Sequence, residues 1–348
     1  MDLNFPWQFN LEIEENEALG AMPTQGLLWW SRLPMALLAA TSGLLIFLFV
    51  KESADRVAGY VFSILYILNP YLSITLRHAM GESSLLFFTQ MATFAGISAL
   101  AASDKVRCAN HGSPSSKMPL APLFWLVLFG FGAGLAGASK LNGLAILFAG
   151  VIIAILIYHV SKKHLSKSTG KSFLIRAIAS FFLATGLVFI IVNPYLYPNP
   201  IYRTSLMIRF RDHEISLQKS LYPENVIVEG SRLSVLSERI LQNNTVFDFP
   251  GGLLVNTLLF GVGMWRLLSS GYKWIIRRDG SATSVIILIV ALATVIPSLF
   301  TPLDWDRYYL YPVIFVTVCV AIGIGWIAQV GFRGLVHVWR LLKRLCLG

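Results

Sequence analysis

Charged residues are scarce in this sequence, and their scarcity limits what the protein can be. Asp, Glu, Lys and Arg make up only 13% of its 348 residues, whereas hydrophobic residues make up 55%. Soluble domains carry about 25% charged residues, and the mean hydropathy here is +0.66. The composition therefore excludes an ordinary soluble domain and indicates an integral membrane protein.

Signatures of common cofactor and nucleophile chemistry are also missing. The sequence contains no P-loop, no Rossmann glycine pattern and no serine nucleophile elbow. Cys108, Cys319 and Cys346 are expected in a cytoplasmic loop, within a span and in the cytoplasmic tail, which argues against a disulfide or a zinc site. His78 has no second histidine at ligand spacing. We therefore expect no cofactor and no metal.

What the sequence does contain is a series of long apolar runs. A bilayer core requires about 20 apolar residues per helix, and backbone groups in lipid must be paired within the segment. Runs of this length without alternation are helical. They lie at residues 33–50, 57–75, 83–102, 120–138, 141–159, 173–192, 252–269, 283–300 and 309–330. We therefore predict an all-α fold, a polytopic transmembrane helix bundle of about nine spans with one larger extracytoplasmic segment.

The spans divide the chain into five parts. We expect an extracytoplasmic N-terminal segment (1–32), a first part of the bundle (33–193), an extracytoplasmic loop (194–250), a second part of the bundle (251–330) and a basic cytoplasmic tail (331–348). The 194–250 segment is long and hydrophilic, and its periodic Leu and Ile predict one or two surface helices on the membrane, followed by a loop. Loops of this length are usually functional.

The distribution of charge predicts the orientation. If the N-terminus lies outside, most of the 28 lysines and arginines fall on the opposite side of the membrane, and most of the 18 acids fall on the N-terminal side. Cytoplasmic loops carry such an excess of basic residues. We therefore expect an extracytoplasmic N-terminus and a cytoplasmic C-terminus in the plasma membrane of a prokaryote. The loops account for the net charge of +10, so we expect no nucleic-acid partner.

Mixed charge and aromatic residues gather at the short junctions on the predicted outer side. These junctions are LRHAMGESS (76–84), GASKLN (137–142), NPYLYPNPIYR (193–203) and TPLDWDRYYLYP (301–312). A charge held at the rim of a bundle can act on a ligand in a partly desolvated cleft. Lys140 either extends to the membrane surface or faces a bound anion. Arg307 either pairs with Asp304 and Asp306 or binds an external anion.

The order of these motifs resembles a known family. RLPMALLAATSGLL opens a helix, NPYLSITLRHAMGESSLLFF lies between the next two, and GLAGASKLNGLAIL, VNPYLYPNP and DRYYLYPVIF follow. This series resembles the GT-C glycosyltransferases related to protein mannosyltransferases and bacterial aminoarabinose transferases. The resemblance implies transfer of a sugar from a polyprenyl-phosphate carrier, held between the helices and the lipid bilayer, to a glycan, lipid or protein acceptor on the extracytoplasmic side.

The resemblance also implies roles for individual residues. The leaving polyprenyl phosphate needs positive partners, because stabilisation of its developing charge is usually the largest catalytic term. Arg77, Lys140 and Arg307 stand at the matching positions. The aromatic RYYLYP would suit the interfacial end of the lipid. The expected substrate-binding residues are Arg77, His78, Glu82, Lys140, Asp306, Arg307 and Tyr308.

The catalytic carboxylate is the point at which the sequence departs from the family. An acceptor hydroxyl needs a carboxylate to take its proton, and the family's acid lies early in the first outer loop, after a first transmembrane helix. Met1 begins in what resembles the latter half of that loop. Glu12 and Glu15 are the remaining candidates for the catalytic role, although a solvated acidic run explains them more simply.

Three functions therefore remain open. The first is a glycosyltransferase that moves a hexosyl or pentosyl group. The second is a non-catalytic or truncated membrane subunit of such an enzyme. The third is a secondary transporter, which would carry ionisable groups near the bilayer midplane, whereas the centres of these spans are apolar.

The predicted orientation can be tested with single cysteines at Ser220 and Ser166. We expect an impermeant thiol reagent added to intact cells to label a cysteine at position 220, in the extracytoplasmic segment, and to spare one at position 166, in a cytoplasmic loop. Permeabilised cells provide the control, because both cysteines should then react. Labelling at position 166 alone in intact cells would reverse the orientation.

Overall fold

The computed structural model describes residues 12–21, 25–77, 81–109, 120–162, 167–243 and 251–347. Within these residues the regular structure is helical, and the β-pairing is limited to an isolated antiparallel bridge between Val226 and Leu303. The predicted all-α class is confirmed.

Eight of the described helical segments are long and apolar enough to cross a membrane. They lie mainly in α2 (Gln25–Ser53), α5 (Glu82–Ala109), α6 (Leu120–Ser139), α7 (Ile146–Ser161), α8 (Lys167–Ile191), α11 (Gly252–Arg277), α12 (Ala282–Val295) and α13 (Leu310–Leu347). Short 3-10 turns extend three of them, namely η1 (Leu141–Ala145) before α7, η5 (Ile296–Phe300) after α12 and η6 (Asp306–Tyr309) before α13. A bent pair of helices makes nine if it is counted as one span, which agrees with the predicted bundle of about nine.

The bent pair occupies the run predicted at 57–75 as one continuous span. In the structure α3 (Arg56–Leu68) and α4 (Pro70–Arg77) meet at an angle of 67°. Pro70 cannot continue a helix and disfavours helical backbone at the preceding residue, and Asn69 is accordingly extended. Asn69 also caps α4, because its Oδ1 accepts a hydrogen bond from the Leu72 backbone N–H at 3.1 Å. The local sequence Asn-Pro therefore accounts for the break.

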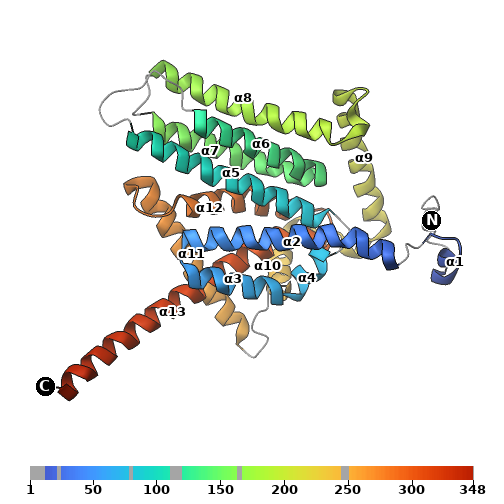
Figure 1. The fold of residues 1–348 in the computed structure, drawn as a ribbon. Coiled ribbons are helices and arrows are strands. Elements are labelled where there is room, and N and C mark those ends of the chain that lie inside the picture. Colours follow the sequence, from blue (N-terminus) through green and yellow to red (C-terminus); the bar gives the residue numbers. More distant parts are fainter. Residues whose placement is uncertain are drawn as a thin grey trace.

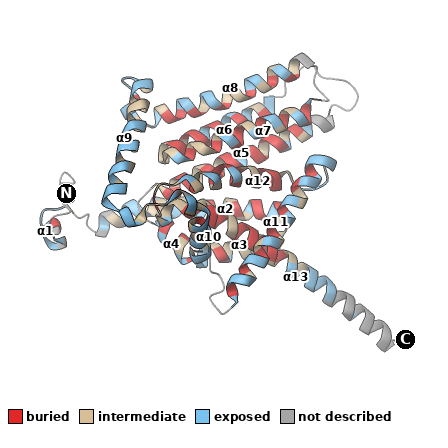
Figure 2. Cartoon of the chain, turned by 180° about the vertical axis from the view of Figure 1, so that it is seen from behind, coloured by how far each residue is buried: buried red, intermediate tan, exposed pale blue. Residues whose placement is uncertain are grey.

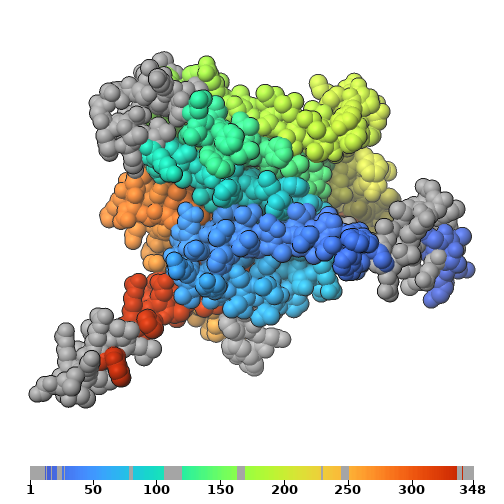
Figure 3. Space-filling view, in the orientation of Figure 1, coloured from blue at the N-terminus to red at the C-terminus, as the bar shows by residue number. Residues whose placement is uncertain are grey.

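The bundle has two parts, each with its own hydrophobic core (Figure 1). One core lies mainly among α5, α6, α7, α8 and α12, and the other mainly among α2, α3, α4, α11 and α13. Figure 3 shows α2 and α3 in blue across the front of the molecule, with α5 to α8 above them. Large apolar side chains are exposed on the spans, for example Phe148, Ile67 and Leu68. Such a surface suits contact with lipid, and the chain is an integral, multi-pass membrane protein.

One end of the bundle carries additional polar structure, and we call it the polar end. Here α9 (Pro200–Leu221) follows α8 and runs across the bundle, roughly perpendicular to the spans (Figure 1). None of its residues is buried (Figure 2). The second helix, α10 (Arg232–Asn243), packs against η5, η6 and α13. Two helices are thus present in the segment predicted to contain surface helices, and residues 244–250 lie outside the described ranges.

The two chain ends lie at opposite ends of the bundle (Figure 1). The short helix α1 (Ile13–Ala18) lies beyond the start of α2 on the side of the polar end. At the other end α13 continues through the predicted tail as one helix to Leu347. The segments predicted to share the outer side therefore do share one end of the structure.

Two glycines allow α11 and α13 to pack backbone against backbone. A Cβ atom on Gly263 of α11 would overlap the carbonyl oxygen of Cys319 of α13, and one on Gly323 of α13 would overlap the carbonyl oxygen of Leu259. Small residues at such crossings let helices approach closely in membranes. This contact holds the final span in the core.

We expect Gly263→Ala to destabilise the protein, because the added methyl group meets rigid backbone. Overpacking of this kind costs about 1–3 kcal/mol. Gly261→Ala is the matched control, because nothing lies within 4 Å of a Cβ at that position of the same helix, and alanine favours helix. Thermal unfolding in detergent measures both variants. Equal unfolding temperatures for the two would contradict the contact.

Candidate functional site

Two adjacent cavities open at the polar end. The first, which we call the cationic cavity, has a volume of about 470 Å³. Its charged lining residues are Glu82, Lys140, Arg211 and Arg307. The second, which we call the broad cavity, has a volume of about 1320 Å³ and lies between α4, α9, α10 and η6. Glu82 and Arg307 line both cavities, so these two residues mark the wall between them.

Glu82 and Lys140 form an ion pair within this wall. Glu82 is the first residue of α5, where the helix dipole favours negative charge. Lys140 follows the last residue of α6. The two helix ends approach closely because Gly81 has no side chain, and a Cβ there would lie 2.9 Å from the carbonyl oxygen of Ser139. Glu82 and Lys140 are 58 residues apart along the chain, so the sequence alone does not predict their ion pair.

The two oxygens of Glu82 differ in their environment. Oε1 accepts a hydrogen bond from the Lys140 ammonium, whereas Oε2 is buried and has no hydrogen-bond partner within the described residues. Glu82 as a whole is only 2% exposed. An unsatisfied buried polar atom costs free energy, so this oxygen requires an explanation.

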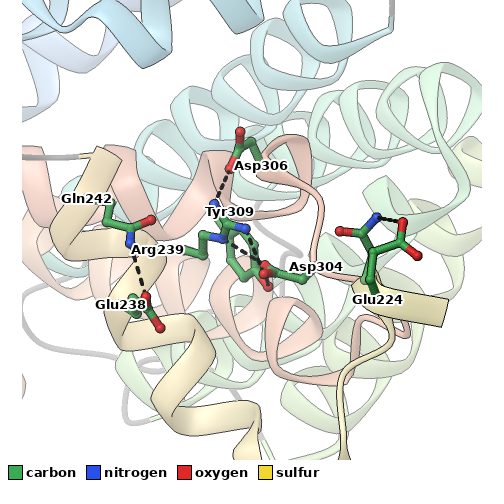
Figure 4. Close-up of polar contacts among 8 residues, drawn as sticks. Glu224, Glu238, Arg239, Gln242, Asp304, Asp306 and Tyr309 are labelled. Carbon is green, nitrogen blue, oxygen red and sulfur yellow. Dashed lines mark hydrogen bonds and ion pairs between the residues drawn. The ribbon is translucent and has the colours of Figure 1, made fainter. Parts of the chain in front are cut away.

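Arg239 of α10 binds both acids that precede Arg307 in the sequence (Figure 4). Its Nε donates to Asp304 Oδ1 at 2.9 Å and its Nη2 to Asp304 Oδ2 at 2.7 Å, and its Nη1 donates to Asp306 Oδ1 at 3.3 Å. The Tyr309 hydroxyl donates a third hydrogen bond to Asp304, at 3.0 Å. Bidentate contacts of this kind are among the stronger polar interactions in proteins.

The pKa of Asp304 reflects these contacts. Partial burial by itself would raise this pKa, but the hydrogen bonds from Arg239 and Tyr309 and the charge of Arg239 outweigh it, and the pKa lies below its usual value. Asp304 therefore remains ionised and bound to Arg239 at neutral pH. Its contribution to stability is present above its ordinary pKa of 3.8 and is lost as the pH falls through the lower folded-state value.

Arg307 is held by aromatic rings. Its guanidinium lies 4.4 Å from the centre of the Trp305 ring and 5.6 Å from that of Tyr308, distances typical of cation–π contacts. Among the described residues, the ion pairs of Asp304 and Asp306 are made with Arg239. The local Asp–Arg pair considered from the sequence is therefore not the arrangement found.

Arg211 completes the charged lining of the cationic cavity, and sequence reasoning did not identify it. It comes from the exposed helix α9, and its Nη2 donates to the Tyr308 hydroxyl at 3.2 Å. No sequence signal pointed to this role, because Arg211 is one of several basic residues in a surface helix. Only the position of α9 across the polar end brings it to the cavity.

The structure brings together five of the residues expected to bind substrate. Glu82, Lys140, Arg307 and Tyr308 line the cationic cavity, and Asp306 lines the broad cavity. Arg77 is exposed at the end of α4 and belongs to neither set of lining residues, and the ion pair of Glu82 is made with Lys140. His78 lies outside the described residues.

The two candidate catalytic glutamates lie elsewhere. Glu12 and Glu15 are exposed, and the Glu15 carboxylate accepts a hydrogen bond from the Glu12 backbone N–H at 3.1 Å. This hydrogen bond is one half of a helix capping box at the start of α1. Neither residue is among those that line the cavities.

Across the described ranges, no three or more His, Cys, Asp or Glu residues are grouped so that they could hold a metal ion. The charged side chains of the cationic cavity, with three cations to one acid, are instead suited to an anion.

We expect the Arg239–Asp304 contact to have a coupling energy of about 1–2 kcal/mol, as for charged hydrogen bonds in partly buried positions. Arg239→Ala, Asp304→Ala and the double variant provide the cycle, read out by thermal unfolding in detergent. The control is a second cycle that combines Asp304→Ala with Arg209→Ala, at an exposed site on α9. The stability changes of these two variants should be additive. Additivity in the first cycle too would show that this contact contributes nothing.

Comparison with known proteins gives one family match. Residues 6–203, more than half of the chain, match the model of the dolichyl-phosphate-mannose-protein mannosyltransferase family. No curated protein matches the chain.

Among solved structures, the chain is similar to the apo oligosaccharyltransferase of Archaeoglobus fulgidus, with 17% identity and a TM-score of 0.42 over 94% of this chain and 42% of that one. The same organism's oligosaccharyltransferase AglB in complex with an inhibitory peptide and a dolichol-phosphate gives 16% identity, a TM-score of 0.43 and coverage of 94% and 42%. The chain thus spans about two-fifths of the length of these solved proteins. On the family match, the chain belongs to the dolichyl-phosphate-mannose-protein mannosyltransferase family.

Proposed function

We propose that this chain is a membrane glycosyltransferase, or the membrane-embedded part of one. It moves a sugar from a polyprenyl-phosphate carrier to a glycan, lipid or protein acceptor on the extracytoplasmic side. The observation that carries the proposal is the cationic cavity, in which Lys140, Arg211 and Arg307 face one acid, Glu82. The family to which the chain belongs is named for a lipid-phosphate-linked sugar.

The charge of the cavity suits the leaving group of this reaction. When the bond between the sugar and the phosphate oxygen breaks, negative charge develops on the phosphate. Cations already in place stabilise that charge without reorganising, and in a partly desolvated cleft they act more strongly than in water. Arg307 is well suited because its planar fork can bind two phosphate oxygens at once.

The surroundings of the cavity suit a lipid carrier. A small apolar pocket between α2, α5, α12 and α13 shares Thr294 and Tyr311 with the cationic cavity. It offers a place for the start of an isoprenoid chain. Tyr195, Tyr197 and Tyr202 are exposed where α8 passes into α9, and such aromatic residues are enriched at the membrane–water interface.

The proposal includes an orientation. The excess of Lys and Arg in the loops of the opposite end supports placing the polar end on the extracytoplasmic side of a prokaryotic plasma membrane. The position of α9, across the ends of the spans and without buried residues, supports a helix that lies on the membrane surface. The acceptor then reaches the cavities from outside the cell.

A non-catalytic membrane subunit is the second candidate function. It is supported by the position of Glu12 and Glu15, which are exposed and absent from the lining of both cavities. Such a subunit would bind the carrier and transfer nothing. Purified protein that binds polyprenyl phosphate but releases no sugar from any glycosylated carrier would support this candidate over the enzyme.

Arg307→Lys tests the carrier site. We expect it to lower the affinity for a polyprenyl phosphate at least tenfold, or by about 1.4 kcal/mol, because lysine keeps the charge but loses the planar fork. Arg307→Ala should cost as much or more. Binding is measured on purified protein in detergent.

Arg209→Lys is the matched control, because Arg209 is exposed on α9 and lines neither cavity. Its affinity should equal that of the wild type. Unchanged affinity in both Arg307 variants would remove Arg307 from the site, and a wild-type protein without affinity for the carrier would refute the proposed function.

A further inference from the structure

The unpaired oxygen of Glu82 is a feature that phosphate binding does not explain. Glu82 is 2% exposed, its Oε1 is bound to Lys140, and its Oε2 has no hydrogen-bond partner among the described residues. The residue belongs to the lining of both cavities. A buried carboxylate left half-satisfied is costly, so a bound ligand that completes it would gain affinity there.

The chemistry of the carboxylate restricts what that ligand group can be. An ionised carboxylate only accepts hydrogen bonds, so its partner must be a donor. The phosphodiester of a glycosylated carrier is an anion without a proton to give, and it is repelled by the like charge. A hydroxyl group is a suitable donor, and charge-assisted hydrogen bonds of this kind are stronger than neutral ones. The cavity thus combines sites for an anion with an acceptor for a hydroxyl.

The position of Glu82 indicates which hydroxyl it binds. In the proposed reaction Lys140 contacts the phosphate, and Glu82 contacts Lys140, so Glu82 lies on the same side of the sugar as the leaving group. A carboxylate that takes a proton from an acceptor attacking in line has to lie on the opposite face of the anomeric carbon. Glu82 is therefore poorly placed for that role and well placed beside the sugar attached to the phosphate.

We propose that Glu82 is a donor-sugar recognition residue, whose Oε2 accepts a hydrogen bond from a hydroxyl of the glycosyl group carried on the phosphate. The inference rests on the proposed function. Through this hydrogen bond Glu82 distinguishes the glycosylated carrier from the bare carrier, which has the same phosphate and lipid but no sugar hydroxyl.

Lys140 couples binding of the phosphate to binding of the sugar hydroxyl. Its side chain is long, flexible and 28% exposed, whereas that of Glu82 is 3% exposed. Water does not reach Oε2 in the present arrangement, so a ligand group must displace part of the cavity wall. A phosphate in the cavity attracts the Lys140 ammonium and weakens its contact with Glu82. The hydrogen bond from the sugar hydroxyl then compensates Glu82 for part of that lost contact. After transfer the bare phosphate faces Glu82 without that compensation, which favours release of the product.

The test compares carrier affinities in wild type and Glu82→Gln. The probes are one polyprenyl phosphate and the same lipid phosphate bearing mannose, glucose, galactose or arabinose, measured on the full purified chain. We expect wild type to bind at least one glycosylated carrier about tenfold more tightly than the bare carrier, as a charged hydrogen bond would provide. In Glu82→Gln this preference should fall to threefold or less, while affinity for the bare carrier rises because the cavity becomes more positive.

Glu238→Gln is the matched control, since Glu238 is exposed on α10 and lines neither cavity. It should keep the wild-type preference. A purely structural role for Glu82 would lower both affinities equally, and that result would overturn the inference.

A second measurement needs no variant. Wild-type protein should lose the same preference when the hydroxyls of the bound sugar are O-methylated, because a methyl ether cannot donate a hydrogen bond. Equal affinity for the native and methylated sugars, or no preference for any sugar, would overturn the inference. If wild type still binds the bare carrier in an Arg307-dependent way, the proposed function survives that failure.

Discussion

Arg239 binds the carboxylates of Asp304 and Asp306, and the arrangement of the polar end depends on this contact. It joins α10, which lies in the segment between α8 and α11, to the turn that opens the final span. It also occupies the acids that stand next to Arg307 in the sequence. As a result Arg307 faces both cavities with its charge available, and a long-range pair takes the place of the local one.

The site lies where the two parts of the bundle meet. Glu82 and Lys140 come from the ends of α5 and α6, whose core includes α7, α8 and α12. Arg307 and Tyr308 come from η6 at the start of α13, which belongs to the other core. Close packing at Gly81 on one side and at Gly263 on the other fixes the helices that carry these residues. The geometry of the cavity therefore depends on contacts throughout the bundle.

Much of this architecture could be predicted from the sequence, because lipid imposes simple rules on length and composition. The spans agree with the apolar runs except at 57–75, which is bent. Lys140 and Arg307 were chosen from the charges at helix ends and from the family resemblance. The bend at Asn69 could also have been read from its Asn-Pro pair. The pairing of Glu82 with Lys140, the contact of Arg239 with Asp304 and the arrival of Arg211 from α9 could not, because each depends on how distant helices pack.

The aromatic contacts of Arg307 have an entropic consequence. A free arginine side chain carries about 2 kcal/mol of rotamer entropy, which is lost when it is immobilised on a ligand. Here the guanidinium already rests against Trp305 and Tyr308, so much of that freedom is lost on folding and little remains to be lost on binding. Trp305 and Tyr308 thus raise the affinity of Arg307 for an anion without contacting the anion themselves.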